Sequence, residues 1–491
     1  MAKRTAVIDI GSNSVGMVIY EKTSRFAFHL IYQAKSKVRI SQDAYKNNGN
    51  LQDIPMQRTF DALADFTSVI SSMDARKTLC VATSALRDAP NAKEFTLRIK
   101  KKLGLKIKII DGQREAYLGG IACANLLPPQ ENALSIDIGG GSTEFAFIDA
   151  KNIKQTLSLN LGTVRLKELF CDNDDAQGAK EYIDEKLSAL DTIQTDKLIG
   201  IGGTFRAVAT GIMQQIDFPL VKLHAFECES TQVTPYIEQL LIADKLRLLE
   251  LGIKENRFDV IKPGALILQR VIHKLSIKHL IASSVGVREG LYLSDLLRNS
   301  KDKLPVNYNT SVRNILDMYV ADKHYSNNLN KVAKTLFDLL KNKLNLQEHF
   351  RTSVAISAKL YPSGSSIHQF SLNKHSYHLI KSALEYGLSQ KEMILISTLV
   401  RYAKRKLPST NHVKKYAQLL PEIDTLNTLS YILSLSIALL SHRPRNIDFT
   451  LELDEDSIIV KSKSSFYLSK EEIHSLESLP HSKLEVRCFV I

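Results

Sequence analysis

Apolar strand-like runs alternate with helical patterns along the first 300 residues, and one strand-and-loop pattern occurs twice. Near residue 6 the chain reads AVIDIGSNSVGMVIY, and near residue 134 it reads LSIDIGGGSTEFAFI. In both copies a β-branched apolar run leads into Asp-Ile-Gly, a short turn rich in glycine or serine, and a second apolar strand. Further strands and helices follow each copy in the same way. The repeat predicts two like α/β half-domains, at residues 1–120 and 121–300.

The remainder of the chain has a different pattern. From about residue 305 the apolar positions recur at helical spacing, after a linker that reads NSKDKLPVN. Residues 301–444 are therefore expected to form a helical domain. The segment DFTLELDEDSIIVKSKSSFYL alternates apolar and polar residues, which is typical of a β-hairpin, and a helix and a last strand follow it. This pattern predicts a small α/β domain at residues 445–491.

The composition indicates a globular protein, with 44% hydrophobic and 24% charged residues. No apolar run approaches the about 20 residues that span a bilayer, and the first strand follows MAKR directly, so we expect a cytoplasmic protein without a membrane contact. The scattered cysteines lack metal-binding spacing, which favours reduced thiols. The net charge of +13 reflects either solvated helix faces or a polyanionic partner. No nucleic-acid-binding motif is present, so we expect no specific nucleic acid partner.

The glycine-rich turns are the segments best suited to bind phosphate. Glycines let the backbone turn tightly and present N–H groups to an anion, and hydroxyls add donors. The candidates in the two repeated loops are Ser12, Asn13, Ser14, Gly140, Gly141, Ser142 and Thr143. In IGIGGTFRAVA, Gly202 and Gly203 precede a helix whose first amides could bind an anion, although a plain strand–helix turn explains them equally well. The absence of GxxxxGK[ST] excludes a Walker-type NTPase.

Acidic residues near these turns could hold a metal ion or activate water. Asp137 and Glu144 are the best Mg²⁺ candidates, with Asp9 as a possible third, because Mg²⁺ binds one or two carboxylates together with substrate phosphate. Glu115 starts a helix in IIDGQREAYLGG and could polarise an attacking water, although a glutamate there also simply favours the helix dipole. Arg87 could bind a phosphate with two hydrogen bonds, or could be an ordinary surface arginine.

Seven segments together resemble the exopolyphosphatase / guanosine pentaphosphate phosphohydrolase family in content and order. They cover residues 6–297 and read DIGSNSVGMVIY, ATSALRDAPNAKEF, IIDGQREAYLGG, SIDIGGGSTEFAFI, NLGTVRLKE, IGIGGTFRA and VGVREGLYLSDLL. The resemblance implies the actin-like, ribonuclease H-like fold of the actin, Hsp70 and sugar-kinase ATPases for the two half-domains. It continues more weakly through the helical region, so the expected fold class is α/β, with two actin-like half-domains, a helical HD-like domain and a small α/β tail.

The resemblance also implies roles for individual residues. Glu115 matches the catalytic base of the family's Gly-x-x-Glu-Ala motif, and Arg87 matches the arginine that binds the reacting phosphate. Asp137 and Glu144 match the ligands of the divalent ion. Arg39, in KSKVRI, resembles a basic phosphate-binding residue at the edge of the cleft. The serines, the asparagine and the glycines of the repeated loops match the phosphate-binding loops.

The helical region departs from the family pattern. Family members with an HD-like region often carry His-Asp or His-Glu after a Leu-rich helix, whereas this chain has Tyr361 and Pro362 near that position. No His-Asp dipeptide occurs in the sequence, so we expect no second metal-dependent activity there. His368, His375 and His378 are accordingly interpreted as ordinary surface or core residues.

The residues and the family resemblance together imply a Mg²⁺-dependent hydrolase that releases terminal orthophosphate from inorganic polyphosphate, an exopolyphosphatase. Removal of the 5′-phosphate from guanosine pentaphosphate in the stringent response is the first alternative, with guanosine tetraphosphate as a related ligand. A nucleotide sensor without turnover, an ATPase and a sugar kinase of the same fold are the others. The presence of Glu115, Asp137 and Arg87 argues against the sensor. We expect the chain to form a homodimer.

Overall fold

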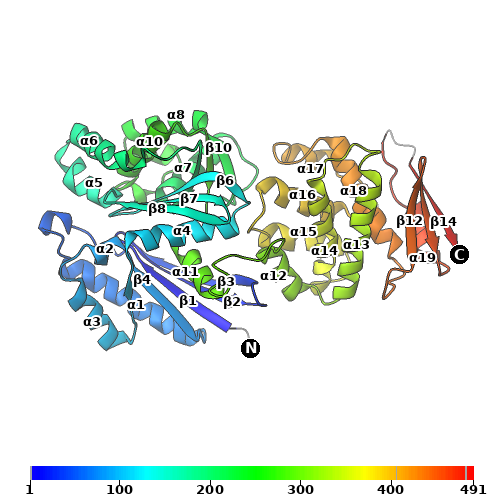
Figure 1. Ribbon diagram of the computed structural model, residues 1–491, viewed down its shortest axis with the longest axis horizontal. Coiled ribbons are helices and arrows are strands. Elements are labelled where there is room, and N and C mark those ends of the chain that lie inside the picture. The colour runs from blue at the N-terminus through cyan, green and yellow to red at the C-terminus, as the bar shows by residue number, and fades with distance from the viewer. Residues whose placement is uncertain (1–2, 405, 481–483, 491) are drawn as a thin grey trace. The chain divides into compact units, whose positions relative to one another are not determined.

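The chain is divided into two compact units, Met1–Tyr308 and Asn309–Ile491. The computed structural model describes residues 3–404, 406–480 and 484–490, and its elements are labelled along the chain in Figure 1. Among the helices of the described ranges, none combines the length and the apolar character that crossing a bilayer requires.

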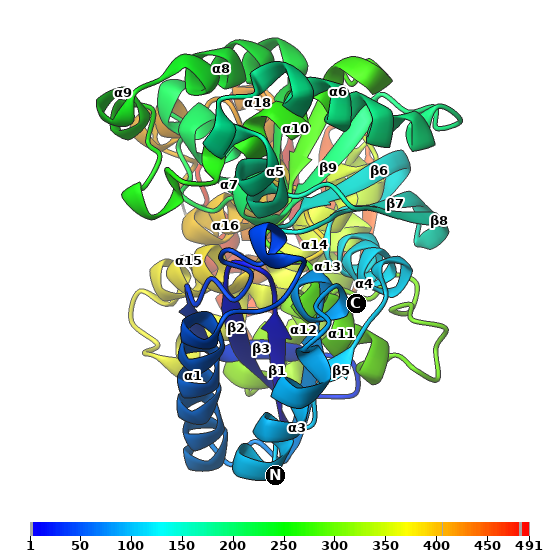
Figure 2. The same cartoon turned by 90° about the vertical axis from the view of Figure 1, so that its left-hand side faces the viewer.

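The first half of unit one is built on a five-stranded sheet with the order β3-β2-β1-β4-β5. Its strands are β1 (Lys3–Ile10), β2 (Val15–Lys22), β3 (Phe28–Ser36), β4 (Lys77–Ala82) and β5 (Lys108–Ile109). β1 pairs antiparallel with β2 and parallel with β4, so the carboxyl ends of β1 and β4 lie at the same edge of the sheet. Helices α1 (Asp53–Ser72), α2 (Ser84–Arg87) and α3 (Ala92–Leu103) complete this half, and Figure 2 shows α1 and α3 beside the sheet.

The second half repeats this plan on a six-stranded sheet with the order β10-β11-β9-β6-β7-β8. Its strands are β6 (Gln130–Ile138), β7 (Thr143–Ala150), β8 (Asn152–Leu159), β9 (Lys197–Ile201), β10 (Phe226–Glu229) and β11 (His279–Ala282). β6 pairs antiparallel with β7 and parallel with β9, as β1 does with β2 and β4. The helices are α5 (Thr163–Leu169), α6 (Ala176–Leu187), α7 (Gly202–Gln215), α8 (Ser230–Ile242), α9 (Lys245–Glu250) and α10 (Ile261–Leu275).

Two helices connect these halves. α4 (Gly112–Leu126) packs against β7 and β8 and against α11 (Val287–Leu296), and α11 in turn contacts β1. A β-carbon at Gly290 would lie 1.9 Å from the carbonyl oxygen of Leu118, so only glycine permits this close helix packing. The Tyr20 hydroxyl of β2 donates to Glu289 Oε1 at 2.6 Å. The start of α4, which carries Glu115, is therefore placed by contacts with both halves.

The second unit is mostly helical. Its helices are α12 (Thr310–Tyr319), α13 (Lys323–Leu340), α14 (Phe350–Leu360), α15 (Leu372–Ala383), α16 (Gln390–Tyr402), α17 (Thr410–Lys415), α18 (Ile423–Leu439) and α19 (Tyr467–His474). A three-stranded sheet contains β12 (Phe449–Asp454), β13 (Ser457–Ser462) and β14 (Glu485–Val490). β12 and β13 form an antiparallel hairpin, where the alternation of apolar and polar residues predicted one. Apolar residues of this sheet, including Phe449, Ile458 and Val460, share one core with the long helices.

Short 3₁₀ turns complete the structure. They are η1 (Tyr45–Asn47), η2 (Cys171–Asn173), η3 (Ser188–Leu190), η4 (Glu255–Arg257) and η5 (Tyr361–Ser366).

Candidate active site

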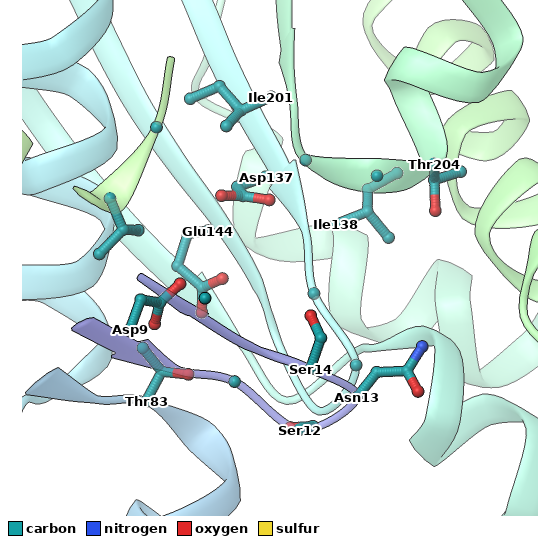
Figure 3. A pocket seen from close by; sticks show the side chains of 18 of the residues that line it. Asp9, Ser12, Asn13, Ser14, Thr83, Asp137, Ile138, Glu144, Ile201 and Thr204 are labelled. Atoms are coloured by element: carbon teal, nitrogen blue, oxygen red, sulfur yellow. The ribbon is translucent and has the colours of Figure 1, made fainter. Parts of the chain in front are cut away.

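A cavity of about 220 Å³ lies in unit one where the loops after β1 and β6 face each other (Figure 3). The ends of β4 and β9 and the starts of α4, α7 and α11 also contribute to its wall. The predicted site residues in its lining are Ser12, Asn13, Ser14, Glu115, Asp137, Gly140, Ser142, Glu144, Gly202 and Gly203. Segments that are far apart in the sequence therefore meet at one cavity.

The two repeated loops adopt the same turn. In each, the amide of the first residue donates to the carbonyl of the fourth, at 3.1 Å in residues 11–14 and at 2.9 Å in residues 139–142. The loops approach each other so closely that a β-carbon at Gly140 would lie 2.7 Å from Ser12 Cβ. Ser12 Oγ lies 3.0 Å from Ser84 Oγ, at the start of α2. The sequence repeat is thus a repeat in structure, and it lines one site with amides and hydroxyls from both halves.

Glu115 lies in the first turn of α4, where the side chain of Asp111 caps the helix. It is only 8% exposed, and Arg87 Nη1 donates to Glu115 Oε2 at 3.1 Å. Burial raises the pKa of the Glu115 carboxyl well above its usual value, and the Glu144 carboxylate adds to this effect, whereas Arg87 opposes it. Arg87 also donates to Ser142 Oγ at 3.3 Å, which connects it to the second loop. A buried carboxyl with a raised pKa beside a fixed cation is suited to take up a proton.

Three further carboxylates, those of Asp9, Asp137 and Glu144, line the cavity (Figure 3). Asp137 and Glu144 are paired on the neighbouring strands β6 and β7, whereas Asp9 comes from β1 of the other sheet. Burial raises the pKa of Asp9 to about 6 and that of Glu144 to about 8, and it also raises the pKa of Asp137. Ser158 Oγ donates to Glu144 Oε1 at 2.9 Å. Within the described residues, Asp9 Oδ1 and Glu144 Oε2 are buried without a hydrogen-bond partner.

These orphaned oxygens are the kind of donor that a divalent cation uses. In the part of the chain that the structure describes, no group of three or more His, Cys, Asp or Glu is arranged as a metal site. The available donors therefore fit an ion that keeps several waters and phosphate oxygens, as Mg²⁺ does, better than one that requires a full set of protein ligands.

Four cations in the wall of the cavity were not predicted as site residues: Lys35, Arg206, Arg257 and Arg288. They come from β3, α7, η4 and α11, and burial together with the neighbouring arginines lowers the pKa of Lys35 to about 8. Arg206 donates to two carbonyls of the loop after β11, at 3.0 and 2.8 Å. Lys35, Arg206 and Arg288 stand within the quoted segments KSKVRI, IGIGGTFRA and VGVREGLYLSDLL, so their segments were noticed although the residues were not assigned to the site. Arg257 lies in none of the quoted segments.

A second hollow of about 510 Å³ adjoins the first and shares several residues with it. Its described lining contains Lys35, Lys37, Arg206, Lys254 and Arg257 and has neither an acidic nor an aromatic residue. The second hollow therefore extends the site beyond the repeated loops with basic residues and no carboxylate in its described lining.

Four predicted residues lie outside the lining of the cavity. Arg39 is paired with Asp259 at 3.0 Å, and Arg87 is hydrogen-bonded to Glu115 and Ser142, which do line the cavity. Thr143 is buried at the start of β7, where its hydroxyl donates to a main-chain carbonyl. A β-carbon at Gly141 would lie 2.4 Å from the Tyr45 hydroxyl, which leaves no room for a side chain at that position.

The duplicated mixed sheets, with phosphate-type loops facing each other, define an actin-like fold. Comparison with known proteins assigns the chain more closely. A sequence model described as the Ppx/GppA phosphatase family matches residues 18–299, and one described as Ppx/GppA phosphatase, domain III, matches residues 308–484. The chain belongs to the Ppx/GppA phosphatase family, and the expected family and fold class are confirmed.

Two curated relatives illustrate the range of this family. The guanosine-5′-triphosphate,3′-diphosphate pyrophosphatase of Photobacterium profundum is 24% identical over 486 residues, which cover 96% of this chain and 93% of that protein. The bifunctional 3-dehydroquinate synthase/phosphatase of Fusobacterium nucleatum is 29% identical over 286 residues, which cover 54% of this chain and only 43% of that protein.

Two solved structures are similar in fold to about three fifths of this chain. The exopolyphosphatase from Cytophaga hutchinsonii is 25% identical, with a TM-score of 0.56, and the match covers 60% of this chain and 98% of that one. The Aquifex aeolicus member of the Ppx/GppA family is 26% identical, with a TM-score of 0.53, and the match covers 61% of this chain and 99% of that one.

Proposed function

We propose that this phosphatase is a Mg²⁺-dependent exopolyphosphatase, which releases terminal orthophosphate from inorganic polyphosphate. The observation that carries the proposal is the pairing of Glu115 with Arg87 at 3.1 Å beside two facing phosphate-type loops. A buried carboxyl, a fixed guanidinium and converging amides are the groups that hydrolysis of a phosphoanhydride requires.

In the proposed reaction the loops at residues 11–14 and 139–142 bind the terminal phosphoryl group through amides and hydroxyls. Arg87 lies next to both Glu115 and Ser142, so it can donate to an equatorial phosphate oxygen as negative charge develops. A water molecule attacks the terminal phosphorus, and Glu115 accepts its proton. The anhydride P–O bond breaks, the shortened chain leaves with the bridging oxygen, and orthophosphate is released.

Asp137 and Glu144, with Asp9 beside them, would hold the Mg²⁺ ion. When bound, the ion neutralises charge on the substrate phosphates. The same ion would give the buried Asp9 Oδ1 and Glu144 Oε2 the partner that the described residues do not supply. The Asp137 carboxylate adds to the effect of burial in raising the pKa values of Asp9 and Glu144, and a cation among the three would oppose this effect.

The second hollow favours polyphosphate over a nucleotide. Its described lining presents five cations and no aromatic ring. A guanine base would find no stacking partner in that lining, whereas a chain of phosphates would meet positive charge along it. The alternative, hydrolysis of guanosine pentaphosphate, is supported by the Photobacterium profundum relative, whose match covers 93% of that protein.

The test is a comparison of initial rates of orthophosphate release from polyphosphate and from guanosine pentaphosphate, with Mg²⁺ and purified full-length protein. We expect the larger kcat/KM with polyphosphate. A larger kcat/KM with guanosine pentaphosphate would select the alternative, and no release from either substrate would reject both.

Replacement of Glu144 by glutamine tests the metal assignment. We expect the Mg²⁺ concentration for half-maximal activity to rise about tenfold or more, because even indirect support of a metal ligand is worth about 10- to 100-fold in affinity. The melting temperature should not fall, since the substitution removes a buried carboxyl whose pKa is raised. Asp149→Asn is the control, because its side chain lies on the same strand and is 45% exposed. An unchanged Mg²⁺ requirement in Glu144→Gln would contradict the assignment.

A further inference from the structure

Glu168 lies in the segment NLGTVRLKE, to which the proposed reaction assigns no role. It belongs to α5 of the second half, yet its carboxylate binds the backbone of the first half. The amide of Asp43 donates to Glu168 Oε1 at 2.8 Å, and the amide of Tyr45 donates to Glu168 Oε2 at 3.2 Å. Both acceptor oxygens are therefore used, and the residue is only 6% exposed.

The segment that Glu168 binds is the β3–α1 loop, residues 37–52. The same loop is hydrogen-bonded to the first phosphate-type loop, because the amide of Arg39 donates to the Asn13 carbonyl at 3.0 Å and the amide of Ser41 donates to the Ser12 carbonyl at 3.1 Å. A displacement of the β3–α1 loop would therefore displace residues 12 and 13 directly.

The helix that carries Glu168 is bonded to the second phosphate-type loop in the same manner. The amide of Thr163 donates to the Gly139 carbonyl at 2.9 Å, and the amide of Val164 donates to the Gly140 carbonyl at 2.8 Å. Arg165 Nε donates to the carbonyl of residue 141 at 2.8 Å. A continuous path of hydrogen bonds thus leads from residues 12–13, through the β3–α1 loop and Glu168, to residues 139–141.

The β3–α1 loop has a conformation that needs external support. Arg39 and Asp43 both have positive φ, of 50° and 59°. Such backbone conformations are unfavourable for residues with a side chain and persist where the surrounding structure fixes them. A further contact joins this loop to α5, because the Arg165 guanidinium lies over the Tyr45 ring at 4.4 Å. Arg165 is also paired at 2.8 Å with Asp88, which follows α2 in the first half. Glu168 is the group among these that binds the loop backbone itself.

We propose that Glu168 is a positioning residue that holds the two phosphate-binding loops at the spacing that the transition state requires. The transition state must be contacted by both loops at once, so a change in their spacing lowers kcat. The rest of a bound polyanion meets Lys35 and Arg257, which Glu168 does not touch, so KM changes much less. This consequence for kcat rests on the proposed function, whereas the fixed spacing of the loops does not.

The experiment compares Glu168→Gln and Glu168→Ala with the wild-type full-length protein. We expect kcat for phosphate release from polyphosphate to fall about 10- to 100-fold, the scale of a misplacement of about 1 Å, while KM changes by less than about threefold. We also expect the amides of Asp43 and Tyr45 to exchange hydrogen with solvent at least about tenfold faster, because each loses its acceptor. The fall in kcat should be smaller for the glutamine variant than for the alanine variant, because the glutamine amide oxygen can still accept one of the two hydrogen bonds.

Lys46→Met is the matched control. It removes a pair with Asp172 that joins the same loop to the same half of the protein, but Lys46 is 45% exposed. Exposed ion pairs contribute little to the stability of a fold, so the loop should keep its position in Lys46→Met. The kcat of this variant should therefore change by less than about twofold.

A folded Glu168→Ala variant with the amide exchange of the wild type would overturn the proposal, and so would accelerated exchange with an unchanged kcat. Should the wild-type protein release no phosphate from polyphosphate, the proposed function fails. Amide exchange in the substrate-free protein then decides alone: acceleration at Asp43 and Tyr45 supports the role of Glu168, and unchanged exchange rejects it.

Discussion

Replacement of Glu115 by glutamine is expected to lower kcat for phosphate release by about 10²- to 10⁴-fold, the usual contribution of a general base. Glutamine keeps the size of the side chain, and its amide oxygen can still accept the hydrogen bond that Arg87 donates at 3.1 Å. It cannot accept the proton of the attacking water. The measurement is the initial rate of orthophosphate release at saturating polyphosphate.

Protein stability should separate this catalytic effect from misfolding. Burial raises the pKa of the Glu115 carboxyl, so this group lowers the free energy of unfolding at neutral pH. Because glutamine is neutral, the melting temperature of Glu115→Gln should equal or exceed that of the wild type. Glu131→Gln, at an exposed position of β6, is the control and should retain wild-type kcat. A folded Glu115→Gln variant with wild-type kcat would show that another group accepts the proton.

Replacement of Arg87 by methionine is expected to have the second largest effect, a fall in kcat/KM of about 10²- to 10³-fold. This is the usual cost of losing one hydrogen-bond donor to the negative charge that develops in the transition state. It should also shift the pH dependence. Arg87 is among the groups that lower the pKa of Glu115, against the larger effect of burial. Without it the carboxyl remains protonated to higher pH, so the acid limb of the kcat/KM profile should move to higher pH.

The control for Arg87 is Arg58→Met, which removes an exposed arginine on α1 and should leave both the rate and the profile unchanged. A smaller rate for Arg87→Met without a shift of the acid limb would indicate that Arg87 binds phosphate but does not affect the ionisation of Glu115. An unchanged kcat/KM would remove Arg87 from the proposed site.

The repeated Asp-Ile-Gly pattern predicted the duplicated half-domains well, for a local physical reason. A β-branched run followed by small residues limits the backbone to a strand and a tight turn, and this limit acts within about ten residues. The loops at residues 11–14 and 139–142 consequently have the same hydrogen bond in the structure. Their facing arrangement was expected only because the pattern occurred twice.

The cations of the site could not be predicted in this way, because a sequence segment that contains a basic residue does not determine where its side chain lies in the fold. Lys35 lies on a strand, Arg206 in a helix and Arg257 in a 3₁₀ turn, and only the tertiary fold brings them to one wall. The family resemblance around Arg39 indicated a basic residue near the cleft but did not determine where its side chain points. In the structure this side chain is paired with Asp259. Long-range packing decides such orientations, and a single sequence contains little information about it.

The most direct test of the central claim is an analysis of the chain lengths and products formed from long-chain polyphosphate by the wild-type protein and by Glu115→Gln, with Mg²⁺. Release at the terminal phosphate predicts that orthophosphate accumulates from the first time point, without fragments of intermediate length from internal cleavage, and that Glu115→Gln forms almost none. Internal fragments, or equal orthophosphate release by the two proteins, would contradict the account.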